Sequence, residues 1–214
     1  MRPENTLEAF AEAARLGADG VELDVRRSAD GALVVRHDAA LPDGRLVANV
    51  QVADLPDDIP LLDAAIDACH GLLVNIEIKN LPHEPGWDPD EVVGAEVAAV
   101  AGGPGRFVVS AFTPATLDAV RAAEPTVPTG LLTLAAFDQM AAIAMVVERG
   151  HGAVHPHHEG LSPAVVAAAH DAGLTVTTWT VDDPDRLRAV ADMGVDAVIT
   201  NHPDVALEVL SPWR

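Results

Sequence analysis

Residues 72–79 read "LLVNIEIK", a strongly apolar segment that also carries a glutamate and a lysine. Side chains of a β-strand alternate between its two faces. As a strand, this segment has an aliphatic face formed by residues 74, 76 and 78 and a polar face formed by Asn75, Glu77 and Lys79. Lys79 is the only lysine among the 13 basic residues. The chain therefore places its single ammonium group at the end of a strand that looks buried.

Residues 20–25, "GVELDV", show the same alternation, with Glu22 and Asp24 on the face opposite the aliphatic side chains. In a parallel barrel the aliphatic face packs under the helices, so the carboxylates point inward. If the two strands are neighbours, Glu22, Asp24 and Glu77 meet near the carboxyl ends of the strands, where barrel active sites lie. Such a group would repel itself unless it held a cation. Oxygen ligands favour Mg²⁺ or Ca²⁺ over zinc, which predicts one divalent cation.

The alternative interpretation is structural: Lys79 neutralises Glu77 in a salt bridge, and Glu22 and Asp24 form an acidic pair that faces the surface. The recurrence of inward polar alternation on two strands favours the metal site. In that interpretation Lys79 reaches a phosphate oxygen beside the metal, because its ammonium is a compact charge on a flexible stem.

Similar apolar runs alternate with helical segments along the whole chain, which predicts parallel strands covered by helices. The strand-like runs are 20–25, 72–78, 107–110, 128–132, 152–156, 174–179 and 196–200, with a short strand at 33–36 that pairs with the first. The predicted helices are 6–16, with Asn5 as N-cap, 61–69, 90–101, 114–123, 136–148, 163–172, 184–192 and 203–210. We expect one domain over residues 1–214. The fold class is α/β, a TIM (β/α)₈-type barrel whose first strand is missing.

Further candidate site residues follow other strands. His37 comes directly after the short strand and is positioned to act over the metal as general acid or base, with Asp38 orienting it. Trp179 ends a strand and suits a wall for a small alcohol moiety; Phe112 has a similar position. The run "HPHH" at 155–158 lacks the spacing of a zinc site.

Composition excludes several classes of function. The net charge of −20 argues against nucleic acid and anionic membranes as partners, and no apolar run approaches the length of a membrane span. The single cysteine, Cys69, excludes an intrachain disulfide and suits a reducing cytoplasm. We therefore expect a cytoplasmic protein.

In combination, the motifs resemble bacterial glycerophosphodiester phosphodiesterases over essentially the whole chain. They are "PENTLEAF", "GVELDVRRSADGALVVRHDAAL", "NIEIK", "SAFTPATL", "GLTVTTWTVDDP" and "GVDAVITNHPDVAL". The resemblance implies a barrel of the PLC-like phosphodiesterase type that hydrolyses glycerophosphodiesters to glycerol 3-phosphate and an alcohol, in lipid and glycerol metabolism. By motif, it implies metal ligation by Glu22, Asp24 and Glu77, catalysis by His37, and substrate contacts by Lys79 and Trp179.

One motif of that family is absent. The family carries His-Arg-Gly on its first strand, shortly before "PENT", and the 214 residues contain no such tripeptide. The alternatives are a reading frame that starts upstream and a natively shorter protein, and the otherwise intact motif set favours the first. We expect impaired catalysis in this chain. We also expect the open strand edges to cause reduced stability or a homodimer.

Two competing functions remain. A non-catalytic barrel that binds phosphoesters or protein partners agrees with the absent His-Arg-Gly, but not with the presence of His37 and Lys79. Another Mg²⁺-dependent barrel enzyme, such as one acting on enolates, would need further carboxylates at successive later strand ends. The strands 107–110, 128–132 and 174–179 end without them. Hydrolysis of a small-molecule glycerophosphodiester is the favoured prediction.

Overall fold

The computed structural model describes residues 2–103 and 106–213. It divides into two compact units, unit 1 at residues 1–127 and unit 2 at residues 128–214, and each is described by itself. The expectation of a single domain stays a prediction. Among the described residues, no helix is both long enough and apolar enough to cross a membrane.

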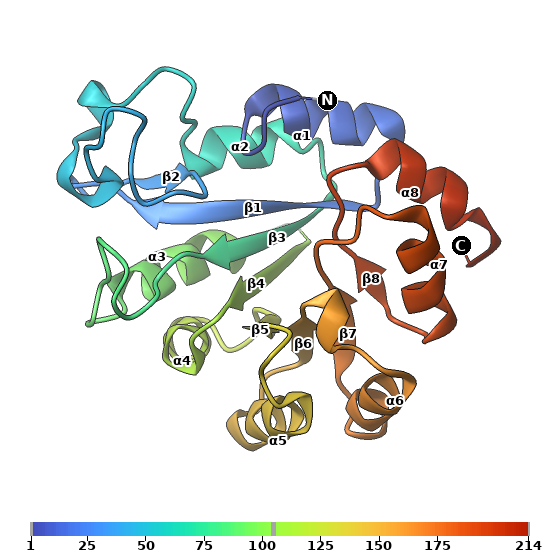
Figure 1. Cartoon of the computed structure of the whole chain (residues 1–214). Helices are drawn as coiled ribbons and strands as arrows, with labels where there is room; N and C mark the ends of the chain where they lie inside the picture. Colours follow the sequence, from blue (N-terminus) through green and yellow to red (C-terminus); the bar gives the residue numbers. More distant parts are fainter. Residues whose placement is uncertain (1, 104–105, 214) are drawn as a thin grey trace. The chain divides into compact units, whose positions relative to one another are not determined.

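Unit 1 contains strands in the order β2-β1-β3-β4 (Figure 1). Their bounds are β1 Gly20–Arg27, β2 Leu33–Val35, β3 Leu73–Ile78 and β4 Phe107–Ala111. Strands β1, β3 and β4 run parallel, whereas β2 pairs antiparallel with the end of β1, with Val25 opposite Val35. The predicted strands of this half of the chain, including the short hairpin strand, are confirmed.

Four α-helices cover this sheet: α1 Leu7–Leu16, α2 Leu62–Ala68, α3 Val92–Ala101 and α4 Pro114–Ala123. Helices α1 and α2 pack together, as do α3 and α4 (Figure 1). The aliphatic face of the strands forms the core, with Leu23, Val25 and Ile76 fully buried. Burial of this face leaves the opposite, polar face of β1 and β3 to form the site.

The N-cap predicted for α1 is wrong by one residue. The hydroxyl of Thr6 accepts the hydrogen bond from the Ala9 amide, so Thr6 is the N-cap. Asn5 has φ 56°, in the left-handed region that asparagine tolerates better than most residues. Its side chain turns away from the helix, because it bonds to β1 instead.

Residues 36–60 form an excursion between β2 and α2 that the sequence patterns do not resolve into elements. It contains the short 3₁₀ helices η1 Val47–Asn49 and η2 Val52–Asp54. Its buried side chains Leu41, Val47 and Val50 form a small aliphatic core with Val34 of β2. This small core anchors the segment that carries His37, which immediately follows β2.

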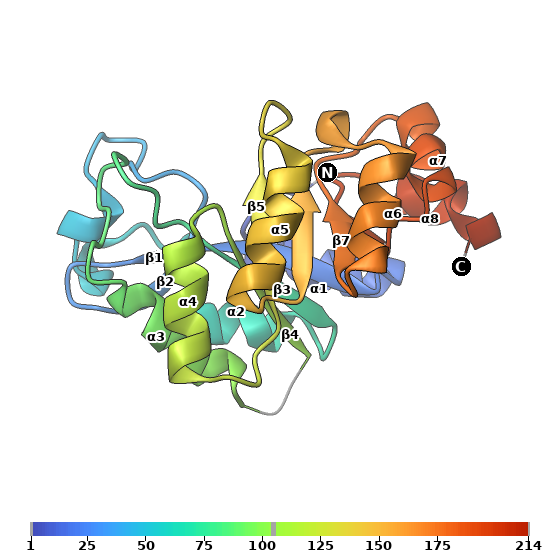
Figure 2. The same cartoon turned by 90° about the horizontal axis from the view of Figure 1, so that it is seen from below.

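Unit 2 contains the parallel strands β5 Thr129–Thr133, β6 Ala153–Pro156, β7 Thr175–Thr178 and β8 Ala197–Val198, in that order. Its α-helices are α5 Gln139–Arg149, α6 Pro163–Asp171, α7 Pro184–Asp192 and α8 Pro203–Val209, and its 3₁₀ helices are η3 His158–Gly160 and η4 Ser211–Trp213. Helix α5 packs along β5 and β6 (Figure 2). Side chains of Ser162 and Asp183 cap α6 and α7, and Gly150 ends α5 in the left-handed conformation. The predicted βα alternation is confirmed here too.

Candidate active site

Three carboxylates converge on the polar face of β1 and β3. The strands are parallel neighbours with Asp24 opposite Glu77 and Glu22 opposite Asn75. One oxygen from each of Glu22, Asp24 and Glu77 lies within 4.8 Å of the other two. The alternation of side chains along the strands therefore brings the predicted residues together. The register of β1 and β3 places Asp24 beside Glu77 and Glu22 two residues earlier on the same face.

Burial makes this group electrostatically costly. Asp24 and Glu77 are 5% and 8% exposed. Burial, followed by the nearby charges of Asp24 and Glu77, raises the pKa of Glu22 well above its ordinary value. Burial is also the main reason that the pKa of Glu77 is raised. Oxygen Oε1 of Glu22 is buried without a hydrogen-bond partner among the described residues. An all-oxygen set with an unsatisfied buried oxygen fits a hard divalent cation.

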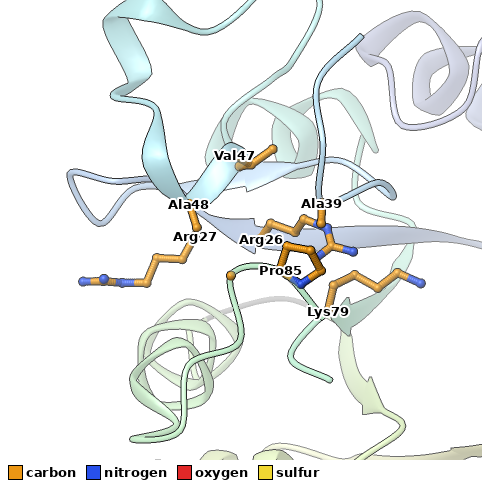
Figure 3. A pocket seen from close by; sticks show the side chains of 8 residues that line it. Arg26, Arg27, Ala39, Val47, Ala48, Lys79 and Pro85 are labelled. Carbon is orange, nitrogen blue, oxygen red and sulfur yellow. The ribbon is translucent and has the colours of Figure 1, made fainter. Parts of the chain in front are cut away.

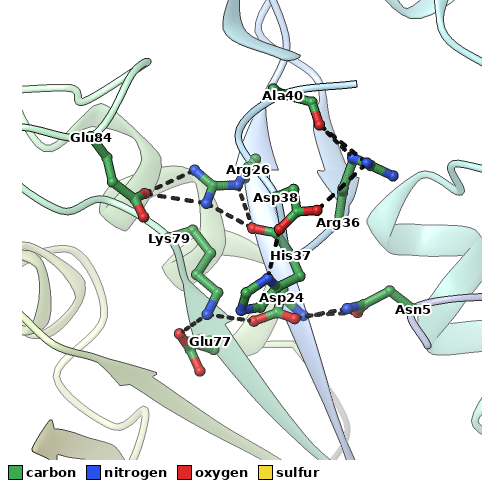
Figure 4. Close-up of polar contacts among 10 residues, drawn as sticks. All are labelled: Asn5, Asp24, Arg26, Arg36, His37, Asp38, Ala40, Glu77, Lys79 and Glu84. Carbon is green, nitrogen blue, oxygen red and sulfur yellow. Dashed lines mark hydrogen bonds and ion pairs between the residues drawn. The ribbon is translucent and has the colours of Figure 1, made fainter. Parts of the chain in front are cut away.

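Lys79 lies against the same carboxylates (Figure 4). Its Nζ is 3.0 Å from Oδ1 of Asp24 and also contacts Oε1 of Glu77, and the Lys79 side chain is 8% exposed. Burial would lower the pKa of this ammonium, but the charges of Glu77 and Asp24 outweigh it and the pKa is raised. The Lys79–Glu77 salt bridge of the structural interpretation is therefore present. Its surface-facing acidic pair is wrong, because Asp24 is buried and its carboxylate lies with those of Glu22 and Glu77.

Asn5 is a site residue that the sequence patterns assign to helix capping instead. Its Nδ2 donates to Oδ2 of Asp24 at 2.7 Å, and its Oδ1 accepts from the Asp24 backbone amide at 3.1 Å (Figure 4). Only the tertiary contact between the segment before α1 and strand β1 reveals this role, because Asn5 and Asp24 are 19 positions apart.

His37 is about half exposed, and its Nδ1 lies 3.0 Å from Oδ1 of Asp38. The hydrogen bond with His37 is the largest cause of a lowered pKa at Asp38. Asp38 is therefore a carboxylate at neutral pH that can orient the imidazole, as predicted. Nδ1 is thus the ring nitrogen of His37 that faces Asp38.

Arg26 holds the main chain at His37. Its Nε and Nη2 both donate to the His37 carbonyl oxygen, at 2.9 and 2.7 Å, and the guanidinium also pairs with Glu84 at 3.2 Å (Figure 4). Arg26 lies on the same face of β1 as Glu22 and Asp24. The period-two pattern of residues 20–25, continued by two residues, would have predicted Arg26 at the site.

A small hollow lies beside this arrangement, between the 36–60 excursion and the segment that follows β3 (Figure 3). Its lining comprises Arg26, Arg27, Ala39, Val47, Ala48, Lys79, Pro85 and Gly86. Cationic side chains thus border the hollow next to the carboxylate group, in a chain whose net charge is strongly negative.

The remaining candidates lie elsewhere. Phe112 follows β4 in unit 1. Trp179 follows β7 in unit 2, where its indole donates to the His155 carbonyl at 2.7 Å and meets the His157 ring edge-on. His157 and His158 stack, and Arg186 donates to His158. His155 is 1% exposed, and burial lowers its pKa to about 4.

Comparison with known proteins identifies the family. The model of the glycerophosphoryl diester phosphodiesterase family matches residues 1–205. The chain belongs to this family. It is 29% identical to a glycerophosphodiester phosphodiesterase of Caldanaerobacter subterraneus, over 97% of this chain and 92% of the relative. The family consists of phosphoric diester hydrolases, and the predicted enzyme class is confirmed.

Solved structures of the family confirm the fold class. The enzyme from Thermotoga maritima is 26% identical with a TM-score of 0.80, and the alignment covers 97% of this chain and 92% of that one. An Oleispira antarctica phosphodiesterase, solved with its product sn-glycerol-3-phosphate, is 24% identical with a TM-score of 0.85, covering 98% and 92%. The chain has the α/β fold of the TIM (β/α)₈ barrel type.

Proposed function

We propose that this family member hydrolyses glycerophosphodiesters, such as glycerophosphocholine, to glycerol 3-phosphate and an alcohol, using one divalent cation. Glu22, Asp24 and Glu77 would hold that ion, either Mg²⁺ or Ca²⁺. The observation that carries the proposal is their convergence, with oxygens within 4.8 Å of one another on a buried face. The Oleispira structure contains the product that this reaction would release.

Other residues of the chain would bind the phosphate group, transfer a proton and line the pocket for the alcohol moiety. A bound divalent cation supplies polarisation of the phosphoryl oxygens. Lys79, already beside the ligand oxygens, would contact the phosphate group and offset its charge. His37, held by Asp38 at Nδ1, would transfer a proton through Nε2 at the attacking or leaving oxygen. Phe112 and Trp179 are the proposed lining for the alcohol moiety.

Turnover by the 214 residues is proposed to be reduced, because they contain neither the His-Arg-Gly histidine nor its arginine. Loss of one general acid or base typically costs about 10²–10⁴-fold. The second candidate function, binding of phosphoesters without turnover, rests on the same absence.

The test measures release of glycerol 3-phosphate from glycerophosphocholine with Mg²⁺ or Ca²⁺, and again with a chelator. We expect turnover that depends on the cation and disappears in Glu77→Gln, while circular dichroism shows the fold retained. Asp54→Asn, on η2 away from the carboxylate group, is the matched carboxylate control and should retain turnover. Glycerophosphocholine binding without turnover would favour the binding function. Undiminished activity of Glu77→Gln would remove Glu77 from the site.

A further inference from the structure

The side-chain amide of Asn5 forms hydrogen bonds with both the main chain and the carboxylate of Asp24. One amide group donates to Oδ2 at 2.7 Å and accepts from the backbone N–H at 3.1 Å. A carboxylate bound at one oxygen only can rotate about its last torsion, which is a soft one. The second contact ties Asn5 to the strand itself, so the amide and the carboxylate are held in one fixed relation.

The backbone around Asn5 is built for this contact. The left-handed conformation at Asn5, φ 56°, directs its side chain toward β1. The neighbouring Thr6 performs the capping, because its hydroxyl accepts from the Ala9 amide and donates to the Pro3 carbonyl at 2.8 Å. Helix α1 therefore begins without the amide of Asn5, which remains available to Asp24.

The two oxygens of Asp24 have different partners. Oδ2 is bound to Asn5, whereas Oδ1 lies 3.0 Å from the Lys79 ammonium, which also contacts Glu77. The donor on Asn5 is neutral, so it orders the carboxylate without adding a second positive charge to that of Lys79. An aspartate at this position would instead add a further negative charge to a buried acidic group.

We propose that Asn5 is a positioning residue that presents Oδ1 of Asp24 to the divalent cation. This inference rests on the proposed cation site and extends it beyond the three carboxylates. Partners that orient a metal ligand typically contribute about 10- to 100-fold to metal affinity or activity. Asn5 does not touch the ion in this scheme; it acts only through Asp24.

The test is the affinity of chelator-stripped protein for Mn²⁺, measured by isothermal titration calorimetry. Asn5→Ala removes both hydrogen bonds, and Asn5→Gly removes them while relaxing the left-handed backbone. We expect both to weaken Mn²⁺ binding about 10- to 100-fold. Thr6→Ala is the matched control: it removes the cap of α1 and should lower the unfolding temperature while leaving Mn²⁺ affinity within about twofold of the unaltered chain.

A second measurement separates positioning from general damage. At low Mn²⁺ concentration Asn5→Ala should hydrolyse glycerophosphocholine more slowly than the unaltered chain, and excess Mn²⁺ should restore much of the difference. Unchanged affinity in Asn5→Ala, or equal weakening by Thr6→Ala, would overturn the inference while leaving the cation site standing. Absence of Mn²⁺ binding in the unaltered chain would overturn both.

Discussion

Replacing Lys79 with methionine separates the electrostatic role of the ammonium from the packing of its stem. Methionine retains an unbranched apolar side chain and removes the charge. The ammonium is 3.0 Å from Oδ1 of Asp24, contacts Glu77 as well, and belongs to a side chain that is 8% exposed. Its removal leaves the buried carboxylates without their protein counter-charge.

The magnitude follows from this geometry. At 3.0 Å and an effective dielectric constant of ~20, one ion pair is worth about 5 kcal/mol, and desolvation of the ammonium offsets part of it. Breaking a buried pair by removing one partner typically costs about 3–5 kcal/mol. We therefore expect Lys79→Met to lose about 3–5 kcal/mol of unfolding free energy at neutral pH in the presence of a chelator.

The assay is urea unfolding followed by far-ultraviolet circular dichroism, with the m-value compared between variants. Arg15→Met is the matched control, because Arg15 pairs with Glu12 on the exposed surface of α1; its urea midpoint should barely change. Adding Ca²⁺ should recover part of the loss in Lys79→Met, since an ion at 100 times its Kd contributes about 2.7 kcal/mol. A loss below about 1 kcal/mol, the range of surface pairs, would refute the claim that these carboxylates are desolvated.

Three further outcomes are expected. Burial lowers the pKa of His155 from 6.5 to about 4, so below pH 6.5 the unfolded chain binds a proton that the folded chain excludes. The unfolding free energy should therefore fall by about 3 kcal/mol more in the unaltered chain than in His155→Asn between those pH values; parallel curves would contradict this. Arg26→Met frees the His37 carbonyl and should reduce kcat about 10- to 100-fold; an unchanged kcat would show that Arg26 does not position His37. Trp179→Ala should raise KM for glycerophosphocholine about tenfold with kcat retained, and an unchanged KM would place Trp179 outside the pocket.

Alternating side chains explain how much of the fold and site could be predicted. Period-two patterns on residues 20–25 and 72–78 specify which side chains share a face, and a one-residue slip would bury charges under the helices. The parallel strands of both units and the convergence of Glu22, Asp24 and Glu77 follow from that constraint. The excursion at 36–60 follows no such period, so its 3₁₀ helices and small core were beyond prediction.

Contacts across long sequence separations explain what was missed. Arg26 and Glu84 are 58 positions apart, and nothing local in either segment indicates the pairing. Asn5 has two competing local roles, capping of α1 or a left-handed turn, and sequence preference favours asparagine for both. The hydrogen bonds to Asp24 stabilise Asn5 in the left-handed conformation, so Asn5 does not cap α1.

The order of residues by itself predicts the succession of strands and helices and the polar face of β1 and β3. It also predicts that Glu22, Asp24 and Glu77 belong to one acidic group. Each depends on side-chain periodicity, which is a local property of the backbone. The partner of each oxygen could not be read in this way: Asn5 on Oδ2 of Asp24, Lys79 on Oδ1, and Arg26 on the His37 carbonyl. Those assignments depend on the exact distances between atoms of separate segments, and these distances are set only once the packed core has fixed the segments against one another.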